Sequence, residues 1–546
     1  MNNKYVLGVD FGTSSVRCIV CRADDGQILG TGSASYPRWE QGLYCDTAKG
    51  IYRQHPLDYI EALEKAALIC AESLPCGVWE NIVGISADTT GSTPAPIDKN
   101  GTPLALLPQF EQCPDAMFQL WKDHCASKEA AELNNVFSSS IYNYTKYQGQ
   151  YSGEWFWAKI LRCARLSPEI ADNATSFAEH CDWIVSELCG GFDAVHIPRS
   201  ACAAGHKALY HTEWNGLPDL DLLASLDPFL KTVGENYRLP PVPAGVRVGG
   251  LCERWAKKLR LKPGISVAAG SLDSHAGAVG AGIREGTMVS SLGTSSVDML
   301  IVKESDCAGK DFTYAGGSAL NSIVPGYVGI ESGQAAFGDI FAWFKELLMW
   351  PLKSGAVKLP NGIIYEEQIL KALETEAAKK PLDCGLAAVD WLNGRRYPYP
   401  DDSAAATLSG LSLSCGAVEI YKALLLSAIF GLRRIYESFK NCGFKIDRIR
   451  ATGGIALKSP YIMQLTADML KTPIEVPNVK EQTALGAAIY AAVGAGIYSS
   501  VEQAQEHMCP GKISCYFPNS KLNSVADKLY GKYILMCEGS DKHSFL

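Results

Sequence analysis

Two stretches of the chain combine glycine with small hydroxyl residues in a way that suits phosphate binding. Residues 12–16 and residues 293–297 both read Gly-Thr-Ser-Ser-Val, and an apolar run precedes and follows each copy. A glycine followed by small residues allows neighbouring backbone N–H groups to turn toward one side, where they form a nest for phosphate oxygens. One copy alone would fit an ordinary hairpin turn equally well, but two copies indicate two related halves that hold one polyphosphate. The candidate nucleotide-binding residues in these turns are Gly12, Thr13, Ser14, Gly293 and Thr294.

The two copies differ in the residue that lies two positions before the glycine. The first copy carries Asp10 where the second carries Ser291. A carboxylate beside a phosphate nest is repelled unless a divalent cation lies between them, and Mg²⁺ is commonly bound by one or two carboxylates together with substrate phosphates. Asp10 therefore predicts a Mg²⁺ site.

A third candidate stretch contains a double glycine. Residues 449–455 read Ile-Arg-Ala-Thr-Gly-Gly-Ile, a strand pattern that ends in Gly453 and Gly454. Ser459 and Pro460 then have the types expected at the N-cap and the first position of a helix. Because glycines lack side chains, the flat face and the ribose of a nucleotide can approach them closely. Neither a Walker A sequence nor a Gly-x-Gly-x-x-Gly fingerprint occurs, which leaves P-loop and Rossmann folds without support.

Regular elements must position these candidates. The apolar patterns predict strands over 6–10, 15–21 and 82–91, a helix over 57–73, a strand from residue 267 that leads to Asp273, and a long amphipathic helix over 417–441. The strand over 82–91 ends in small polar residues, and ligands of α/β proteins bind at strand ends of this kind. The aromatic-rich block over 108–230 has no counterpart after the second turn, so we interpret it as an insertion that carries substrate contacts.

Six residues occur twice in the chain. Ala-Val-Gly-Ala-Gly-Ile stands at 278–283 and again at 492–497. Small residues allow two helices to approach closely, so the repeat predicts a pair of helices that cross at a seam between two domains. Such a seam is a hinge candidate.

Composition limits the class of protein. A chain of 546 residues exceeds the size at which single cores usually stop growing, which predicts two large domains. A net charge of -8 argues against a nucleic-acid partner. No signal-peptide pattern precedes the first strand, so the 19 cysteines are expected to be reduced thiols in the cytoplasm. The longest apolar run, over 484–498, is too short to span a membrane. Homodimer formation is left open.

The order of turns, crossing helices and double glycine resembles the actin-like ATPase superfold, and within it the FGGY family of carbohydrate kinases. The resemblance covers nearly the whole chain. It is carried by G-V-D-F-G-T at 8–13, L-W-K-D-H at 120–124, S-G-E-W at 152–155, C-D-W-I-V at 181–185, A-C-A-A-G-H-K at 201–207, L-D-S-H-A-G at 272–277, E-S-G-Q-A-A-F-G-D-I-F-A-W-F at 331–344 and A-T-G-G at 451–454.

The resemblance implies a fold and an activity. The fold would be α/β, with two actin-like ATPase (ribonuclease H-like) domains that flank a catalytic cleft. Residues 1–282 would bind the sugar and carry the helical insertion, and residues 283–546 would bind the nucleotide. The activity would be ATP- and Mg²⁺-dependent phosphorylation of a ketopentose, first of all L-ribulose to L-ribulose 5-phosphate in arabinose catabolism. The alternatives are D-ribulose or xylulose as substrate, or an ATPase of the actin or chaperone type.

The resemblance also implies roles for single residues. Asp273 would be the catalytic base, and it would hold the sugar together with Gly91, Lys207 and Glu331. Outside this family context, Asp273 would be read as a helix N-cap and Lys207 as an exposed lysine; His275 and the tryptophans are expected to be packing residues. Four places depart from the pattern of ribulose-specific members and leave the identity of the ketose open. They are Asp115 for histidine, Gly91 for alanine, Ser271 for asparagine, and Arg395-Arg396-Tyr397 for Asn-Arg-Ser.

Overall fold

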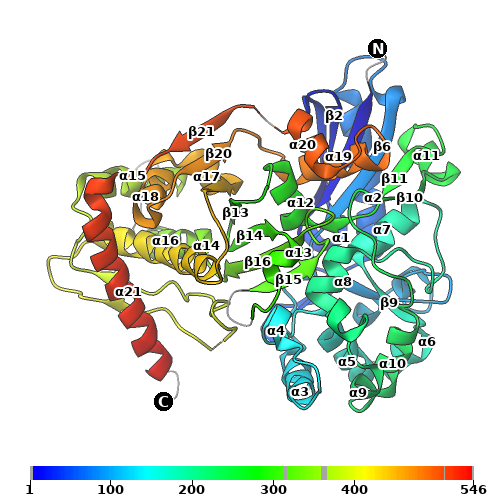
Figure 1. Ribbon diagram of the computed structural model, residues 1–546, viewed down its shortest axis with the longest axis horizontal. Helices are drawn as coiled ribbons and strands as arrows, with labels where there is room; N and C mark the ends of the chain where they lie inside the picture. Colours follow the sequence, from blue (N-terminus) through cyan, green and yellow to red (C-terminus); the bar gives the residue numbers. More distant parts are fainter. Residues whose placement is uncertain (1–3, 313–315, 358–365, 402, 510, 544–546) are drawn as a thin grey trace.

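The computed structural model describes residues 4–312, 316–357, 366–401, 403–509 and 511–543 and divides into two α/β lobes that lie side by side (Figure 1). The first lobe is built on a seven-stranded sheet with the strand order β10-β11-β6-β1-β2-β3, and β12 pairs with β6. Its strands are β1 (Tyr5–Phe11), β2 (Ser15–Arg22), β3 (Ile28–Ser35), β6 (Ile82–Thr89), β10 (Arg247–Gly250), β11 (Ser266–Ala268) and β12 (Ser271–Leu272).

The second lobe is built on a sheet with the order β15-β16-β14-β13-β19-β20-β21. Its strands are β13 (Thr287–Leu292), β14 (Ser296–Val302), β15 (Gly317–Leu320), β16 (Val328–Gln334), β19 (Arg448–Thr452), β20 (Ile474–Pro477) and β21 (Ile513–Tyr516). In both sheets three antiparallel strands are followed by two parallel ones, so that β3-β2-β1-β6-β11 corresponds to β16-β14-β13-β19-β20. Each Gly-Thr-Ser-Ser-Val turn joins the first two strands of its half. The prediction of two related strand-turn-strand units is confirmed.

Helices cover both faces of the first sheet, which explains why β1 is buried along its whole length. Leu7 and Val9 pack in one core with residues of α2 (Pro56–Glu72), whereas Val6 packs in another core with residues of α19 (Gln482–Gly494). The predicted helix over 57–73 corresponds to α2. In the chain, α19 lies between β20 and β21 of the second sheet, but it packs on the first sheet. The two lobes therefore cannot be separated by one cut in the sequence. The boundary at 282/283 stays a prediction.

The aromatic-rich block is helical, as predicted, and much of it packs around a hydrophobic core of its own. Its interpretation as an insertion that carries substrate contacts stays a prediction. Trp157 lies in this core and Trp183 in the core of the first sheet, so these two tryptophans are packing residues as expected. The helices are α3 (Ser127–Ser138), α4 (Thr145–Gln148), α5 (Phe156–Leu166), α6 (Pro168–Asn173), α7 (His180–Leu188), α8 (Ala201–Ala208), α9 (Leu220–Ala224) and α10 (Pro228–Glu235).

The seam between the lobes contains α12 (Asp273–Gly280) and α19, which cross in close contact as predicted. A Cβ atom on Gly486 would overlap the carbonyl oxygen of Ala276, so the crossing depends on glycine. In the first copy of the repeated six residues, Gly280 takes part in the crossing as predicted, because a Cβ atom there would overlap the carbonyl oxygen of Gln482. Both copies also have a role that was not predicted, because they end the two helices. Ile283 N–H donates to the carbonyl of Ala278 at 3.0 Å, and the same bond recurs from Ile497 to Ala492 at 3.0 Å. A glycine with positive φ lies inside each of these ends, which matches the helix-terminating Schellman motif.

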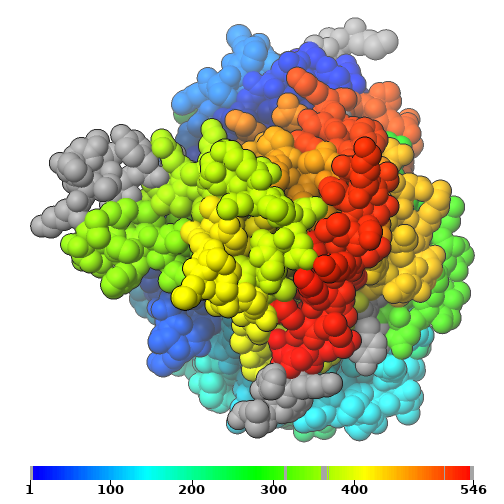
Figure 2. Space-filling view, turned by 90° about the vertical axis from the view of Figure 1, so that its left-hand side faces the viewer, coloured from blue at the N-terminus to red at the C-terminus, as the bar shows by residue number. Residues whose placement is uncertain are grey.

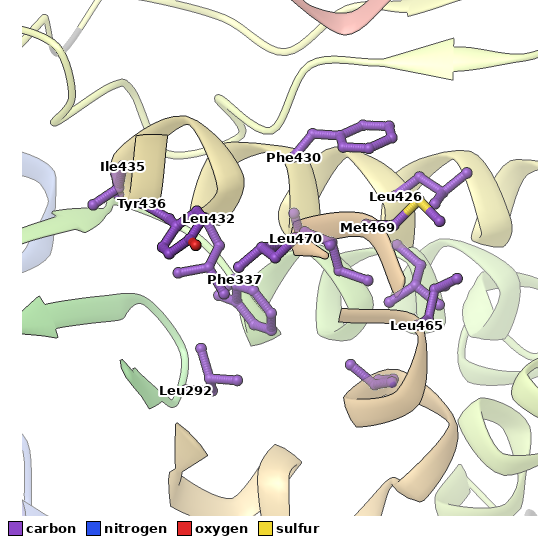
Figure 3. Close-up of a cluster of buried hydrophobic side chains, with 14 of the residues drawn as sticks. Leu292, Phe337, Leu426, Phe430, Leu432, Ile435, Tyr436, Leu465, Met469 and Leu470 are labelled. Carbon is purple, nitrogen blue, oxygen red and sulfur yellow. The ribbon is translucent and has the colours of Figure 1, made fainter. Parts of the chain in front are cut away.

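The core of the second lobe is organised around α16 (Ala417–Asn441), which has the predicted bounds. Figure 3 shows Leu432 and Tyr436 of α16 close to Phe337, with Leu292 beside them. Leu292 and Phe337 are fully buried, and Leu292 is the residue immediately before the second glycine turn. Hydrophobic packing therefore anchors this turn to the lobe. The helices around this core include α14 (Gly338–Lys353), α15 (Glu366–Lys379), α17 (Gly453–Lys458), α18 (Pro460–Leu470) and α21 (Asn523–His543).

The remaining elements are short or peripheral. The helix α21 runs along the outer face of the second lobe, on the side away from the first (Figure 2). In the described part of the chain, no helix has the length and apolar character needed to cross a membrane. The other elements are β4 (Cys45–Asp46), β5 (Ile51–Gln54), β7 (Pro94–Ile97), β8 (Phe118–Gln119), β9 (Ser176–Glu179), β17 (Ala387–Ala388), β18 (Leu408–Ser409), α1 (Pro37–Glu40), α11 (Glu253–Leu259), α13 (Glu304–Cys307) and α20 (Val501–Met508).

Candidate active site

The first glycine turn is held by its carbonyl and hydroxyl groups and leaves backbone donors unused. Gln54 donates to the carbonyl of Thr13 at 2.6 Å, and the backbone N–H of Tyr36 donates to the carbonyl of Ser14 at 3.1 Å. The indole N–H of Trp121 donates to the Thr13 hydroxyl at 3.0 Å. Within the described residues, the backbone N–H groups of Thr13 and Ser14 donate to no protein group. This is the arrangement that a phosphate nest requires.

The second glycine turn has the same property. Its carbonyls at Gly293 and Thr294 accept the backbone N–H groups of Gly338 and Phe337 at 3.0 and 2.7 Å. Among the described residues, no protein group accepts from the backbone N–H of Thr294 or Ser295. The start of α14 is thus fixed against the turn. The two turns present similar unpaired donors from the two lobes.

The glycines of the site do not all serve the same purpose. Gly12 and Gly293 have no positive φ, and a Cβ atom on either would meet nothing closer than 3.4 Å. The expectation that the turns need glycine for their backbone conformation is therefore wrong. Gly453 has a φ of +90° and would place a Cβ 2.5 Å from the carbonyl oxygen of Leu292, so glycine is required there. A Cβ on Gly454 would meet no atom within 4 Å, and the space beside it is open.

The double glycine begins a helix rather than lying in a loop. The strand β19 ends at Thr452, and α17 starts at Gly453. After it, the Ser459 side chain accepts the backbone N–H of Ile462 at 3.0 Å and Pro460 opens α18, as predicted.

Acidic groups gather where the parallel strands of the first sheet end. Asp10 of β1 is the register partner of Asp88 of β6, and Asp88 is the partner of Ser271 of β12. Side chains at partnered positions of parallel strands share a face of the sheet, so Asp10 and Asp88 are neighbours. Asp88 is fully buried, and neither of its carboxylate oxygens has a hydrogen-bond partner among the described residues. Burial raises the pKa of Asp88 well above its usual range, and the nearby charges of Asp10 and Asp273 raise it further.

This acidic pair suits a divalent cation. Burial raises the pKa of Asp10, although Arg17 opposes the shift from 3.2 Å. A cation would relieve both the repulsion and the unsatisfied oxygens of the pair. The described residues contain no cluster of three or more His, Cys, Asp or Glu side chains arranged to hold a metal. Two neighbouring carboxylates do match the protein ligands of Mg²⁺, which is commonly bound by one or two carboxylates together with phosphate and water.

Asp273 lies next to these acids as the first residue of α12. Its neighbour Leu272 occupies the N-cap position, so the N-cap interpretation of Asp273 is wrong. Oδ1 of Asp273 accepts the backbone N–H of Ser274 at 2.6 Å. Burial raises the pKa of Asp273 to about 7, and the charges of Asp10 and Glu331 contribute in the same direction. A carboxyl group with a pKa near neutrality is suited to accept a proton from a substrate.

Lys207 and Glu331 meet across the two lobes. Nζ of Lys207, on α8, lies 3.3 Å from Oε1 of Glu331, on β16. The Lys207 side chain is only 7% exposed, so its interpretation as an exposed lysine is wrong. The ammonium group also lies 5.5 Å from the centre of the Trp155 ring. Burial opposes ionisation of Glu331, but the charge of Lys207 lowers its pKa well below the usual range.

Gly91 lies beside the segment that carries Asp273. A Cβ on Gly91 would overlap a methyl group of Leu272, the residue before Asp273. An alanine at this position would push on Leu272, so the departure at Gly91 affects the immediate surroundings of the predicted base.

Two other departures have partners outside the predicted sugar-binding residues. Asp115 is 3.1 Å from the buried Arg53, whose charge lowers the pKa of Asp115 against the effect of burial. Asp115, which lies in the insertion, is therefore an ion-pair partner of Arg53 on β5. Arg395 packs over the rings of Trp391 and Tyr399, at 4.8 and 3.9 Å. Its neighbour Arg396 lies 3.9 Å from Glu154 of the S-G-E-W segment and so contacts the first lobe.

Two related lobes that each present a phosphate turn define a protein with the two-domain actin-like ATPase fold. Solved structures agree. A xylulose kinase from Rhodospirillum rubrum superposes with a TM-score of 0.81 at 20% identity, over 100% of both chains. A glycerol kinase from Plasmodium falciparum superposes with a TM-score of 0.74 at 18% identity, over 98% of both chains.

Sequence relatives identify the family within this fold. The FGGY family of carbohydrate kinases, C-terminal domain, matches residues 288–495. A ribulokinase from Vibrio parahaemolyticus is 39% identical over 539 residues, which cover 97% of this chain and 95% of the relative. A ribulokinase from Halalkalibacterium halodurans is 34% identical over 98% of this chain and 95% of its own. The chain belongs to the FGGY family of carbohydrate kinases, and it is a sugar kinase that uses ATP.

Four residues of the site were not anticipated from the sequence. Asp88 stands near the end of a predicted buried strand. An acidic residue at such a position was the sequence signal that could have identified it as a site residue. Gly338, which contacts the second turn, had no such signal. Trp121 and His275 were expected to be packing residues, but the structure places them against Thr13 and Glu331.

Proposed function

We propose that this chain transfers the γ-phosphate of ATP to a ketopentose. The first candidate reaction is the conversion of L-ribulose to L-ribulose 5-phosphate in arabinose catabolism. The observation that carries the proposal is the meeting of Lys207, Glu331 and the predicted base Asp273 at the junction of the lobes. The names of the relatives, which are ribulokinases, support the choice of ribulose. A cytoplasmic location, where ATP is available, is part of the proposal.

Asp273 would act on the sugar hydroxyl. Its carboxylate would accept the hydroxyl proton while the hydroxyl oxygen forms a bond to the γ-phosphorus. The bond between that phosphorus and the bridging oxygen of ADP would break, and ADP would leave with its electron pair. Phosphoryl transfer needs little covalent help, so positioning and neutralisation of charge would be the main contributions of the protein. The unpaired N–H groups of the two glycine turns are suited to hold the phosphates.

Asp10, with Asp88 beside it, would hold Mg²⁺. The ion would supply positive charge to balance the phosphate oxygens of ATP. Arg17 lies 3.2 Å from Asp10 and would keep the carboxylate oriented toward the cleft. Gly453 and Gly454 would lie under the nucleoside, because the space beside Gly454 is open.

Selection of the sugar would depend on hydrogen bonds. A ketopentose has no charge, so a donor such as the Lys207 ammonium and an acceptor such as the Glu331 carboxylate must recognise its carbonyl and hydroxyl groups. A wrong sugar would leave one of these buried groups unpaired, at a cost of about 1–3 kcal/mol. Because Asp115 and Arg395 are engaged elsewhere, their departures from the family pattern do not weigh against ribulose.

A substrate panel tests the proposal. ADP release is measured with purified protein, ATP and Mg²⁺ in the presence of L-ribulose, D-ribulose, xylulose, pentoses, pentitols, glycerol and an aldohexose. The proposal expects the highest kcat/KM with L-ribulose. A preference for glycerol or an aldohexose would refute ketopentose specificity, and ADP release that no sugar stimulates would refute the sugar-dependent reaction.

A further inference from the structure

The two oxygens of the Glu331 carboxylate have different partners. Oε1 lies 3.3 Å from Nζ of Lys207, and Oε2 lies 3.2 Å from Nε2 of His275. Lys207 belongs to α8 of the insertion and His275 to α12 at the seam, whereas Glu331 belongs to the second sheet. Both oxygens of the carboxylate are thus contacted by side chains from outside its own sheet.

His275 is neutral in this position. It is fully buried, and burial lowers the pKa of its imidazole to about 4. A neutral imidazole carries one N–H donor and one acceptor nitrogen. With the proton on Nε2, the imidazole directs an N–H group toward the Glu331 carboxylate, and Nδ1 can accept from the Ser274 hydroxyl, which lies 3.4 Å away. The Nε2–H group then lies beside Oε2 of Glu331, close enough for an electrostatic contact although the two groups are not aligned as a hydrogen bond.

The His275 ring is held in place by a second buried histidine. The centre of the His206 ring lies 4.9 Å from that of His275. Nδ1 of His206 is 3.4 Å from Oε1 of Gln148, and the Gln148 amide donates to the carbonyl of Ser318 at 2.7 Å. Because that amide is oriented by its bond to Ser318, its oxygen faces His206. The contacts that hold the His275 ring therefore involve His206 and Gln148 of the insertion and Ser318 of β15.

We propose that His275 is a positioning residue for sugar recognition. Its Nε2–H, 3.2 Å from Oε2, attracts that oxygen and restrains rotation of the Glu331 carboxylate, so that Oε1, the oxygen next to Lys207, is presented to a sugar hydroxyl. Without this contact the carboxylate can rotate, and the acceptor that the sugar needs is no longer held in one direction. This inference rests on the proposed function in one respect, the role of Glu331 in binding the sugar.

Paired substitutions at His275 test the inference. Glutamine can place an amide N–H where Nε2 stands, whereas the shorter asparagine reaches only the Nδ1 position. We expect His275→Gln to keep the sugar KM within about threefold of the wild type, and His275→Asn and His275→Leu to raise it about tenfold or more, as loss of a hydrogen bond to a charged group would do. The KM for ATP should stay unchanged in all three.

A double-mutant cycle separates positioning from general disturbance of the fold. In a Glu331→Gln background the charge that His275 positions is absent, so His275→Asn should add little further increase in the sugar KM. The matched control is His180→Leu, because His180 is also fully buried but stacks on Tyr59 in the core of the first sheet. This control is expected to change the melting temperature and to leave the sugar KM unchanged.

Two outcomes would overturn the inference. One is an equal effect of His275→Asn on the sugar KM with and without the Glu331 carboxylate. The other is a glutamine variant as impaired as the asparagine variant. Failure of the proposed function gives a different result, namely that a sugar other than a ketopentose is the best substrate. In that case the double-mutant cycle is measured with that sugar, and it still decides the role of His275.

Discussion

The ammonium group of Lys207 lies 3.3 Å from the carboxylate of Glu331, and the two residues come from different lobes. Lys207 is on a helix of the insertion, whereas Glu331 is on a strand of the second sheet. A sugar that contacts both groups must lie where the lobes meet, next to Asp273. If both groups bind the sugar, as proposed, sugar binding and the relative placement of the lobes would be linked through this pair of charges.

The first prediction concerns this pair. Lys207→Ala and Glu331→Ala should each raise the KM for the sugar about tenfold to a hundredfold, because each leaves a buried hydrogen-bonding group of the sugar or protein unpaired. The KM for ATP should change little, since neither residue lies at the glycine turns. Steady-state kinetics with both substrates varied checks this, with the exposed Lys257→Ala as control. Parallel increases in both KM values would contradict a role confined to the sugar.

The second prediction concerns the glycine turns. Gly12→Val and Gly293→Val should fold like the wild type, because neither glycine has a positive φ or a close neighbour at its Cβ position. The added side chains would occupy the space that the phosphates need, so calorimetry should show ATP affinity reduced about tenfold or more. Unchanged affinity in both variants, with an unchanged melting temperature, would refute the paired phosphate nest.

The third prediction concerns the cation. Chelation of Mg²⁺ should abolish ADP release, and Asp10→Asn should raise the Mg²⁺ concentration needed for half-maximal activity about tenfold or more, because the charge beside the phosphates is removed. Asp25→Asn, at an aspartate that pairs with Arg22 on the surface, is the control. If Asp10→Asn showed the Mg²⁺ dependence of the wild type, Asp10 would not hold the ion.

The fourth prediction concerns the crossing helices. A side chain on Gly486 would overlap the carbonyl of Ala276, so Gly486→Leu should lower the free energy of unfolding by several kcal/mol or prevent folding. Gly539→Leu, at a glycine of α21 whose Cβ position is open, is the control. Thermal unfolding measures both. Wild-type stability of Gly486→Leu would contradict the close crossing.

The sequence predicted the elements whose information is local. The strands that flank each turn, the helix over 417–441 and the Ser459-Pro460 helix start follow from apolar spacing and from residue types at helix ends. The repeated hexapeptide correctly indicated small-residue helices at the seam. Gly280 has the predicted role of permitting the crossing. The role of Gly282 and Gly496 in ending the helices was not apparent, because the sequence does not distinguish a glycine that ends a helix from one that permits a crossing.

The non-local part of the site could not be derived from patterns. Asp88 faces Asp10 only because β1 and β6 pair in parallel in a particular register, and Glu331 meets Lys207 only when the two lobes are assembled. Asp115 illustrates the opposite case. The aspartate at this position, where the family pattern has histidine, suggested a change in the sugar site. In the structure, however, the Asp115 side chain pairs with Arg53, which lies far from it in sequence.

The pH dependence of the reaction provides the fifth prediction. Burial raises the pKa of Asp273 to about 7, and a base must be ionised to accept a proton, so kcat/KM for the sugar should rise through a pH near 7 and level off above it. The raised pKa also means that the folded state binds this proton more tightly than the unfolded state, so stability due to Asp273 is lost as pH rises toward 7. Asp273→Asn should therefore melt at a higher temperature than the wild type at pH 8, and the difference should shrink as the pH falls toward 4.

The most direct test of the whole account is ADP release with L-ribulose at pH 8, compared between the wild type and Asp273→Asn. The account predicts sugar-dependent turnover by the wild type, and a decrease of about 10²- to 10⁴-fold in a variant that is folded and still binds ATP. Wild-type turnover by a correctly folded Asp273→Asn variant would contradict the account, because the proton of the sugar hydroxyl would then be accepted by another group.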